Sequence, residues 1–147
     1  MIVVRVATGI RSHFDVRATE WLMVYPALGI SIALLYQHSM FSTSPSFQVV
    51  SQYWSETQWA VIGLIVVLVR LVALTVNGTF ARFKYSPHMR LTASVIGLFF
   101  WSQFTLGFAI AALTGNGAWS APIAYSTVCL AELLNINRSW TDIARGR

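Results

Sequence analysis

The chain has 147 residues, of which 56% are hydrophobic and only 10% are charged. Soluble domains carry about 25% charged residues, so this composition excludes an ordinary water-facing surface and favours a protein whose outer surface meets lipid. The net charge of +5 does not indicate nucleic acid binding, because the basic residues lie in short clusters between apolar runs. A single cysteine, Cys129, excludes an internal disulfide framework.

Four apolar stretches are long enough to cross a bilayer as helices, which takes roughly 20 residues each. They cover residues 21–40, 58–76, 91–113 and 119–137. Lipid offers no hydrogen-bond partners to the backbone, so each stretch is expected to be helical. The sequence therefore predicts an all-α fold, a four-helix transmembrane bundle that forms one membrane domain over residues 1–147.

The basic residues predict the orientation of this bundle. Nine of the ten precede the first span, lie between the second and third, or follow the fourth, and the other two connections contain no Lys or Arg. By the positive-inside rule, the basic side is cytoplasmic. We therefore expect a multi-pass protein of a bacterial inner (plasma) membrane with both termini inside. Its exposed cytoplasmic basic residues would include Arg82, Lys84, Arg90, Arg138, Arg145 and Arg147.

Aromatic residues near the span ends are expected to anchor the bundle at the membrane surface, as Trp and Tyr commonly do. Trp59 and Trp140 are examples.

Two further segments have the pattern of short amphipathic helices that lie on the membrane surface. Within residues 44–56, Ser44 can cap a helix, and Phe47, Val50 and Trp54 then share one face. Apolar residues at near-helical spacing over residues 3–14 predict a second interfacial helix, at the N-terminus. Ordinary loops with a few apolar residues are the alternative for both segments, and residues 2–6 could equally be extended.

Two charged residues fall inside the predicted spans, Arg70 in the second and Glu132 in the fourth. A charge at the bilayer centre costs about 2.5–3.5 kcal/mol, so such residues generally face protein or water. Both spans run toward the cytoplasm, and the two residues differ by only about 3 Å in depth, given a rise of 1.5 Å per residue. The sequence thus predicts an Arg70–Glu132 ion pair between two helices.

Each span also has one face of small or polar residues, which a bundle would turn inward. The predicted polar residues of the bundle core are Gln103, Asn77, Asn135 and Tyr125. The predicted helix-packing positions are Gly29, Gly63, Gly107, Ala111 and Gly115. These residues either hold the helices in register or line a path for an ion or substrate.

The sequence contains no pattern that predicts catalysis, a cofactor or a metal site. His13, His38 and His88 lie outside the spans, so a bis-histidine haem is not expected. No cluster of Cys and His has metal-ligand spacing, and no serine has a His or Lys partner at a recognisable spacing. We therefore do not expect an enzyme.

Three stretches, residues 17–21, 70–78 and 125–138, resemble small multi-spanning proteins encoded by bacteriophages and prophages of Gram-negative bacteria. The resemblance implies a phage-type protein placed in the host inner membrane or carried with a virion. It implies no mechanism.

Three functions fit these features. The first is a non-catalytic scaffold or accessory subunit whose partners are the lipid bilayer and either copies of itself or other membrane or virion proteins. The second is a holin-type pore, which would dissipate the membrane potential when expressed. The third is a small four-span transporter, whose coupled uptake would be abolished by Glu132→Gln.

Overall fold

The structure, a computed structural model, describes residue 14 and residues 17–79 and 85–146. These residues form an all-α fold, as predicted, with four helices of seven or more residues. In chain order the elements are α2 (Ala18–Leu22), α3 (Val24–Tyr36), α4 (Met40–Thr43), the 3-10 turns η2 (Pro45–Phe47) and η3 (Val50–Gln52), α5 (Glu56–Thr79), α6 (Ser86–Leu113) and α7 (Ser120–Ala144).

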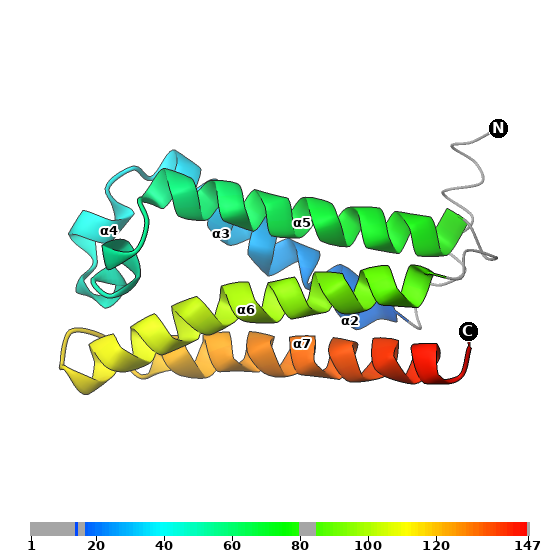
Figure 1. Cartoon of the computed structure of the whole chain (residues 1–147). Coiled ribbons are helices and arrows are strands. Elements are labelled where there is room, and N and C mark those ends of the chain that lie inside the picture. Colours follow the sequence, from blue (N-terminus) through cyan, green and yellow to red (C-terminus); the bar gives the residue numbers. More distant parts are fainter. Residues whose placement is uncertain (1–13, 15–16, 80–84, 147) are drawn as a thin grey trace.

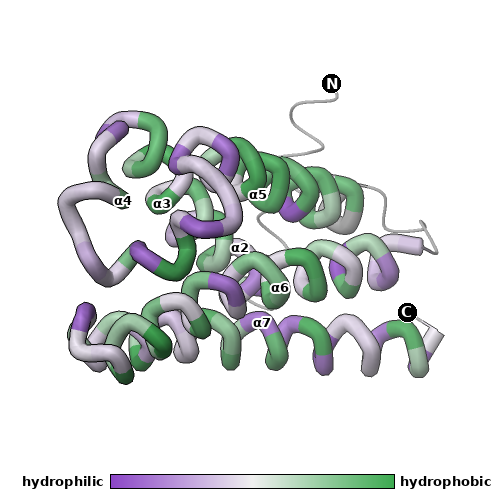
Figure 2. The backbone as a smooth tube through the Cα atoms, turned by 60° about the vertical axis from the view of Figure 1, so that its left-hand side comes forward, coloured by the Kyte–Doolittle hydropathy of each residue, from purple (hydrophilic) through white to green (hydrophobic). Residues whose placement is uncertain are grey.

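Three segments of the described chain are long and apolar enough to cross a membrane, which suggests a multi-pass membrane protein. They are Ala18–Tyr36, Glu56–Val76 and Ser86–Leu113. Helix α7 has 25 residues but is not one of the three. Hydrophobic positions dominate α3 and α5, whereas hydrophilic positions recur along α7 (Figure 2).

The first predicted span differs from the observed helices at both ends and in its middle. It begins at Ala18 instead of residue 21, ends at Tyr36 instead of residue 40, and is interrupted at Met23. Pro26 explains the interruption, because proline has no N–H to donate to the carbonyl of Leu22, four residues earlier, and its ring crowds that carbonyl.

The long helices run alternately up and down. The start of α2, the end of α5, the start of α6 and the end of α7 lie at one end of the molecule, and α4 and the α6–α7 connection lie at the other (Figure 1). Helix α6 packs against both α5 and α7, α5 packs against α3, and α2 contacts α7. We refer to the end with α2 as the basal end and to the end with α4 as the distal end.

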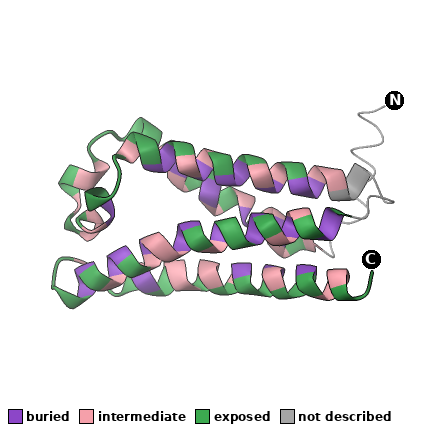
Figure 3. Cartoon of the chain, viewed as in Figure 1, coloured by how far each residue is buried: buried purple, intermediate pink, exposed green. Residues whose placement is uncertain are grey.

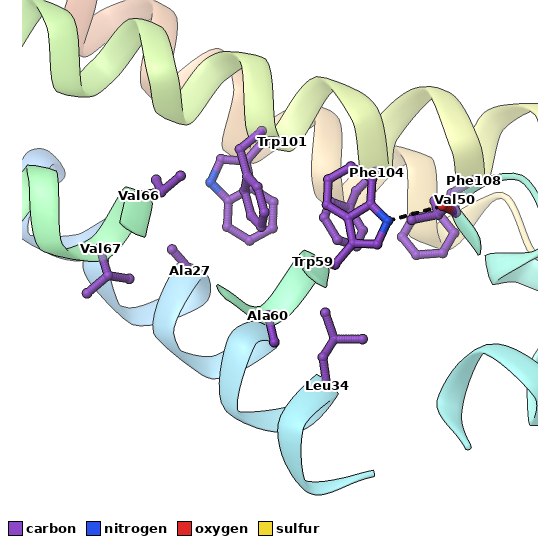
Figure 4. Packing of buried hydrophobic residues seen from close by; sticks show 11 residues of the cluster. Ala27, Leu34, Val50, Trp59, Ala60, Val66, Val67, Trp101, Phe104 and Phe108 are labelled. Carbon is purple, nitrogen blue, oxygen red and sulfur yellow. Dashed lines mark hydrogen bonds between the residues drawn. The ribbon is translucent and has the colours of Figure 1, made fainter. Parts of the chain in front are cut away.

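Aromatic side chains fill the bundle toward its distal end. Trp59 lies against Phe100 and Phe104, with ring centroids 6.1 Å and 5.0 Å apart, and its indole N–H donates to the carbonyl of Val50 over 3.1 Å (Figure 4). Only 2% of Trp59 is exposed, so the expectation that it anchors the protein at the membrane surface is wrong. Its position on α5 faces α6, where aromatic packing outweighs an interfacial site.

The connection between α3 and α5 does not form the single amphipathic helix expected for residues 44–56. It consists of short turns that fold back on the bundle. Val50 is 1% exposed, and the ring of Phe47 lies edge-on to that of Phe108, with centroids 5.0 Å apart. Phe47 and Val50 of the predicted apolar face therefore contact protein, whereas Trp54 is 41% exposed and touches Trp59 edge-on, with ring centroids 4.9 Å apart. The predicted N-terminal interfacial helix lies outside the described residues, apart from Phe14.

Each of the helices α5 and α6 has a buried side and an exposed side. Buried positions lie on the sides of α5 and α6 that face the rest of the bundle, and the outward sides are exposed (Figure 3). The exposed sides carry many large apolar residues, including Ile65, Leu68, Phe99 and Leu106. An outward apolar surface of this kind is typical of helices that face lipid.

Candidate functional site

The basal half of the bundle contains the predicted ion pair between Arg70 and Glu132. One terminal nitrogen of Arg70, on α5, lies 2.6 Å from each carboxylate oxygen of Glu132, on α7, and 3.3 Å from the carbonyl oxygen of Ala93, on α6. Arg70 is 2% exposed and Glu132 is 1% exposed. One arginine thus joins three helices.

Gly97 provides the space for this ion pair, although the sequence analysis did not single it out. A Cβ atom at this position of α6 would lie 2.9 Å from a terminal nitrogen of Arg70 and would overlap an oxygen of Glu132. Glycine at residue 97 therefore allows α6 to pass directly over the pair.

Gly97→Ala is expected to lower the free energy of unfolding by about 1–3 kcal/mol, the usual cost of overpacking a filled interior. Thermal or SDS-induced unfolding of the detergent-solubilised protein would measure the change. Val61→Ile is the matched control, because it adds one carbon atom at a position of α5 that is 47% exposed. Equal losses in the two variants would contradict the proposed close approach.

Hydrogen bonds continue from the ion pair to the basal surface. The amide nitrogen of Asn135 donates to Glu132 over 3.4 Å, and the Thr19 hydroxyl donates to the Asn135 side-chain oxygen over 2.8 Å. Arg138 donates to the same hydroxyl over 2.9 Å. Asn135 is fully buried. These contacts tie α2 to α7 from the interior to the exposed Arg138.

A second charged cluster lies at the basal end and was not predicted. Arg90, at the start of α6, donates to both oxygens of Glu20 on α2, with Nε lying 2.8 Å from the closer one, and it donates to Asp142 on α7 over 2.9 Å. Arg17 lies 3.4 Å from Glu20 and 3.5 Å from Asp142. The expectation that Arg90 is an exposed basic residue is wrong, since it is 1% exposed.

The cluster changes the acidity of its most exposed carboxylate. Partial burial raises the pKa of Asp142, but the hydrogen bond and positive charge of Arg90, together with Arg17, outweigh burial and hold that pKa below its usual value. Asp142 therefore stays ionised, and it contributes to the basal ion cluster at neutral pH.

The sequence did contain a signal for this cluster. In the predicted topology Glu20 precedes the first span and Arg90 precedes the third, so both lie at the cytoplasmic boundary. Comparing depths in the predicted bundle, which pairs Arg70 with Glu132, would therefore have paired Glu20 with Arg90 as well.

The other predicted polar residues occupy different environments. Tyr125 is partly buried and stacks on Phe104 with ring centroids 5.9 Å apart. Gln103 is only partly buried and its amide donates to the adjacent Ser102 hydroxyl over 3.4 Å, so it is not a fully buried core residue. The side chain of Asn77 lies outside the described part, although α5 itself continues through Thr79 instead of ending at Asn77 and Gly78.

Three of the predicted packing positions are at close contacts and two are not. A Cβ at Gly63 would overlap Ser31, one at Gly107 would lie 2.5 Å from Val50, and Ala111 is 1% exposed. Gly29 is exposed, and Gly115 lies beyond α6 in a turn with φ +78°. Gly115 therefore terminates a helix, where glycine adopts positive φ without strain, instead of packing against one.

The remaining predicted basic residues lie at or near the basal end or outside the described residues. Arg138 and Arg145 are exposed on the last turns of α7. Arg82, Lys84 and Arg147 are not among the described residues.

An apolar groove of about 420 Å³ separates α3 from α7. Tyr25, Gly29 and Ala33 line it from α3, and Ala124 and Val128 line it from α7. Three of its nine lining residues are small, Gly29, Ala33 and Ala124, so a further helix could approach the backbone closely at these positions.

Within the described residues, no group of three or more His, Cys, Asp or Glu side chains could hold a metal ion. Comparisons of the chain with protein-family models, with curated proteins and with solved structures found no match. The resemblance to phage-encoded proteins therefore gains no support from them.

Proposed function

We propose that this chain is a non-catalytic, four-span membrane protein that acts as an oligomeric scaffold or accessory subunit, with both termini in the cytoplasm. The observation that carries this proposal is that the buried charged side chains pair with one another across helices. All four charged side chains that are buried in the described part of the chain form ion pairs between helices: Glu20, Arg70, Arg90 and Glu132. Such charges hold helices together, and a path for protons or a charged substrate would need at least one of them to be released from its partner.

The proposal takes α7 as the fourth span, and the directions of its side chains support that assignment. Glu132, Asn135 and Ser139 are buried, whereas Ile123 and Leu130 are 63% and 60% exposed. Glu132 and Asn135 therefore face protein, and the exposed residues between 121 and 136 are apolar except for Thr127.

The filled interior favours a scaffold over a pore within one chain. Phe100 and Phe104 are 2% and 0% exposed, and Trp59 packs between them and Val50. A water-filled path along the bundle axis would require these rings to separate, which would expose a large apolar area.

The groove between α3 and α7 is the surface through which we propose that copies associate. A Cβ atom at Gly29 meets nothing within 4 Å in the single chain, so this glycine serves no contact there. Close approach of a helix from a second copy gives it a role, because small residues let transmembrane backbones pack tightly.

Gly29→Leu is expected to weaken self-association by about 1–3 kcal/mol through overpacking of that contact, while the single chain keeps its thermal stability. Native mass spectrometry of the full chain extracted in mild detergent would measure the distribution of oligomers. Val61→Leu is the matched control, because residue 61 is an exposed position on α5 outside the groove lining.

A wild-type protein that is monomeric under these conditions would overturn the proposed self-association. Rapid loss of the membrane potential on expression would instead favour a pore formed by several copies. Proton-coupled uptake that is lost in Glu132→Gln would favour a transporter.

A further inference from the structure

A polar pocket of about 350 Å³ opens at the basal end, where α2 begins and α7 ends. It is the site of the basal ion cluster but extends beyond it to the last turns of α7. The lining residues are Arg17, Glu20, Arg90, Asn137, Arg138, Thr141, Asp142 and Arg145.

The pocket has an excess of positive charge. Four arginines against two carboxylates leave two positive charges unbalanced. Arg90 contacts both Glu20 and Asp142 at 2.9 Å or less, so the carboxylates are already engaged by that one guanidinium. Arg138 donates to the uncharged hydroxyl of Thr19. Arg138 and Arg145 therefore supply the excess charge on the α7 side of the pocket.

The pocket also lies at the right level for a lipid headgroup. The proposed fourth span ends at residue 137, and Arg138 follows it directly. Trp140, between Arg138 and Arg145 in the sequence, is 63% exposed. Exposed tryptophan at a helix end marks the headgroup region of a membrane.

We propose that this pocket binds the phosphate of an anionic phospholipid headgroup, held by Arg138 and Arg145 with Arg17 beside them. The inference rests on the proposed function, because it requires the basal end to face the cytoplasmic leaflet. Guanidinium groups suit this ligand, since each presents a planar fork of N–H donors to phosphate oxygens.

The test uses the full chain in mild detergent, titrated with phosphatidylglycerol or phosphatidylcholine, with bound lipid counted by native mass spectrometry. We expect the wild-type protein to retain phosphatidylglycerol preferentially. Arg138→Gln combined with Arg145→Gln is expected to weaken this binding about 25-fold, from about fivefold per basic residue at an anionic surface. Arg138→Lys with Arg145→Lys should keep part of the binding, because the charge remains but the fork is lost.

Lys84→Gln is the charge-matched control, since it removes one positive charge from the connection between α5 and α6. If it weakens binding as much as Arg138→Gln alone, the attraction is diffuse and the pocket assignment is overturned. In a separate experiment, inorganic phosphate or soluble glycerol phosphate is added as a competitor of the bound lipid. Competition by either at concentrations comparable to the lipid would overturn the lipid as the ligand.

The outcomes separate this inference from the proposed function. A chain that inserts in membranes and self-associates, yet binds both lipids equally, overturns the headgroup site alone. A chain that does not fractionate with membranes overturns both.

Discussion

Arg70→Met is expected to lower the free energy of unfolding by about 3–5 kcal/mol, because removing one partner of a buried ion pair leaves the other charge uncompensated. Glu132 would then keep only the 3.4 Å contact from Asn135. The loss should appear as a lower SDS fraction at the unfolding midpoint and as a lower thermal midpoint in detergent.

A double-mutant cycle separates the pair from the helix positions that carry it. Arg70→Met with Glu132→Met should recover most of the loss, since replacing both members of a buried pair by apolar residues is often neutral or stabilising. The charge exchange Arg70→Glu with Glu132→Arg should also be more stable than either single change. If the two single losses simply add, the ion pair does not stabilise the bundle.

Arg90→Met is expected to lower the free energy of unfolding by a similar amount, about 3–5 kcal/mol. Glu20 and Asp142 would then keep only their longer contacts with Arg17, at 3.4 Å and 3.5 Å. The same unfolding measurements apply, and Glu20→Met in the Arg90→Met background should recover part of the loss.

Arg145→Met is the matched control for Arg90→Met. It makes the same chemical change on the exposed last turn of α7, where substitutions usually alter stability by no more than about 0.5 kcal/mol. A loss for Arg90→Met as small as that of the control would show that the basal ion cluster does not hold α2, α6 and α7 together.

The sequence alone predicts the helical fold and the apolar stretches that could cross a membrane. It also predicts that Arg70 and Glu132 lie at a similar depth in the bundle. The structure has the helical fold and three helical segments that are long and apolar enough to span a membrane, and Arg70 and Glu132 are in contact. These features depend on distance along the chain, because span length and the rise per residue are set by local geometry. The same reasoning would have paired Glu20 with Arg90.

Only the tertiary structure decided which side of each helix faces protein. Trp59 packs into the core instead of lying at the membrane surface, and Arg90 is buried whereas Arg138 is exposed. Gly97 is at a close contact that the sequence did not indicate, whereas a Cβ atom at Gly29 would meet nothing within 4 Å of the same chain. In lipid, apolar residues are suitable on the inner and outer sides of a span alike, so hydropathy barely specifies the rotation of a helix about its axis. That rotation follows from the simultaneous fit of rings, small residues and ion pairs on neighbouring helices.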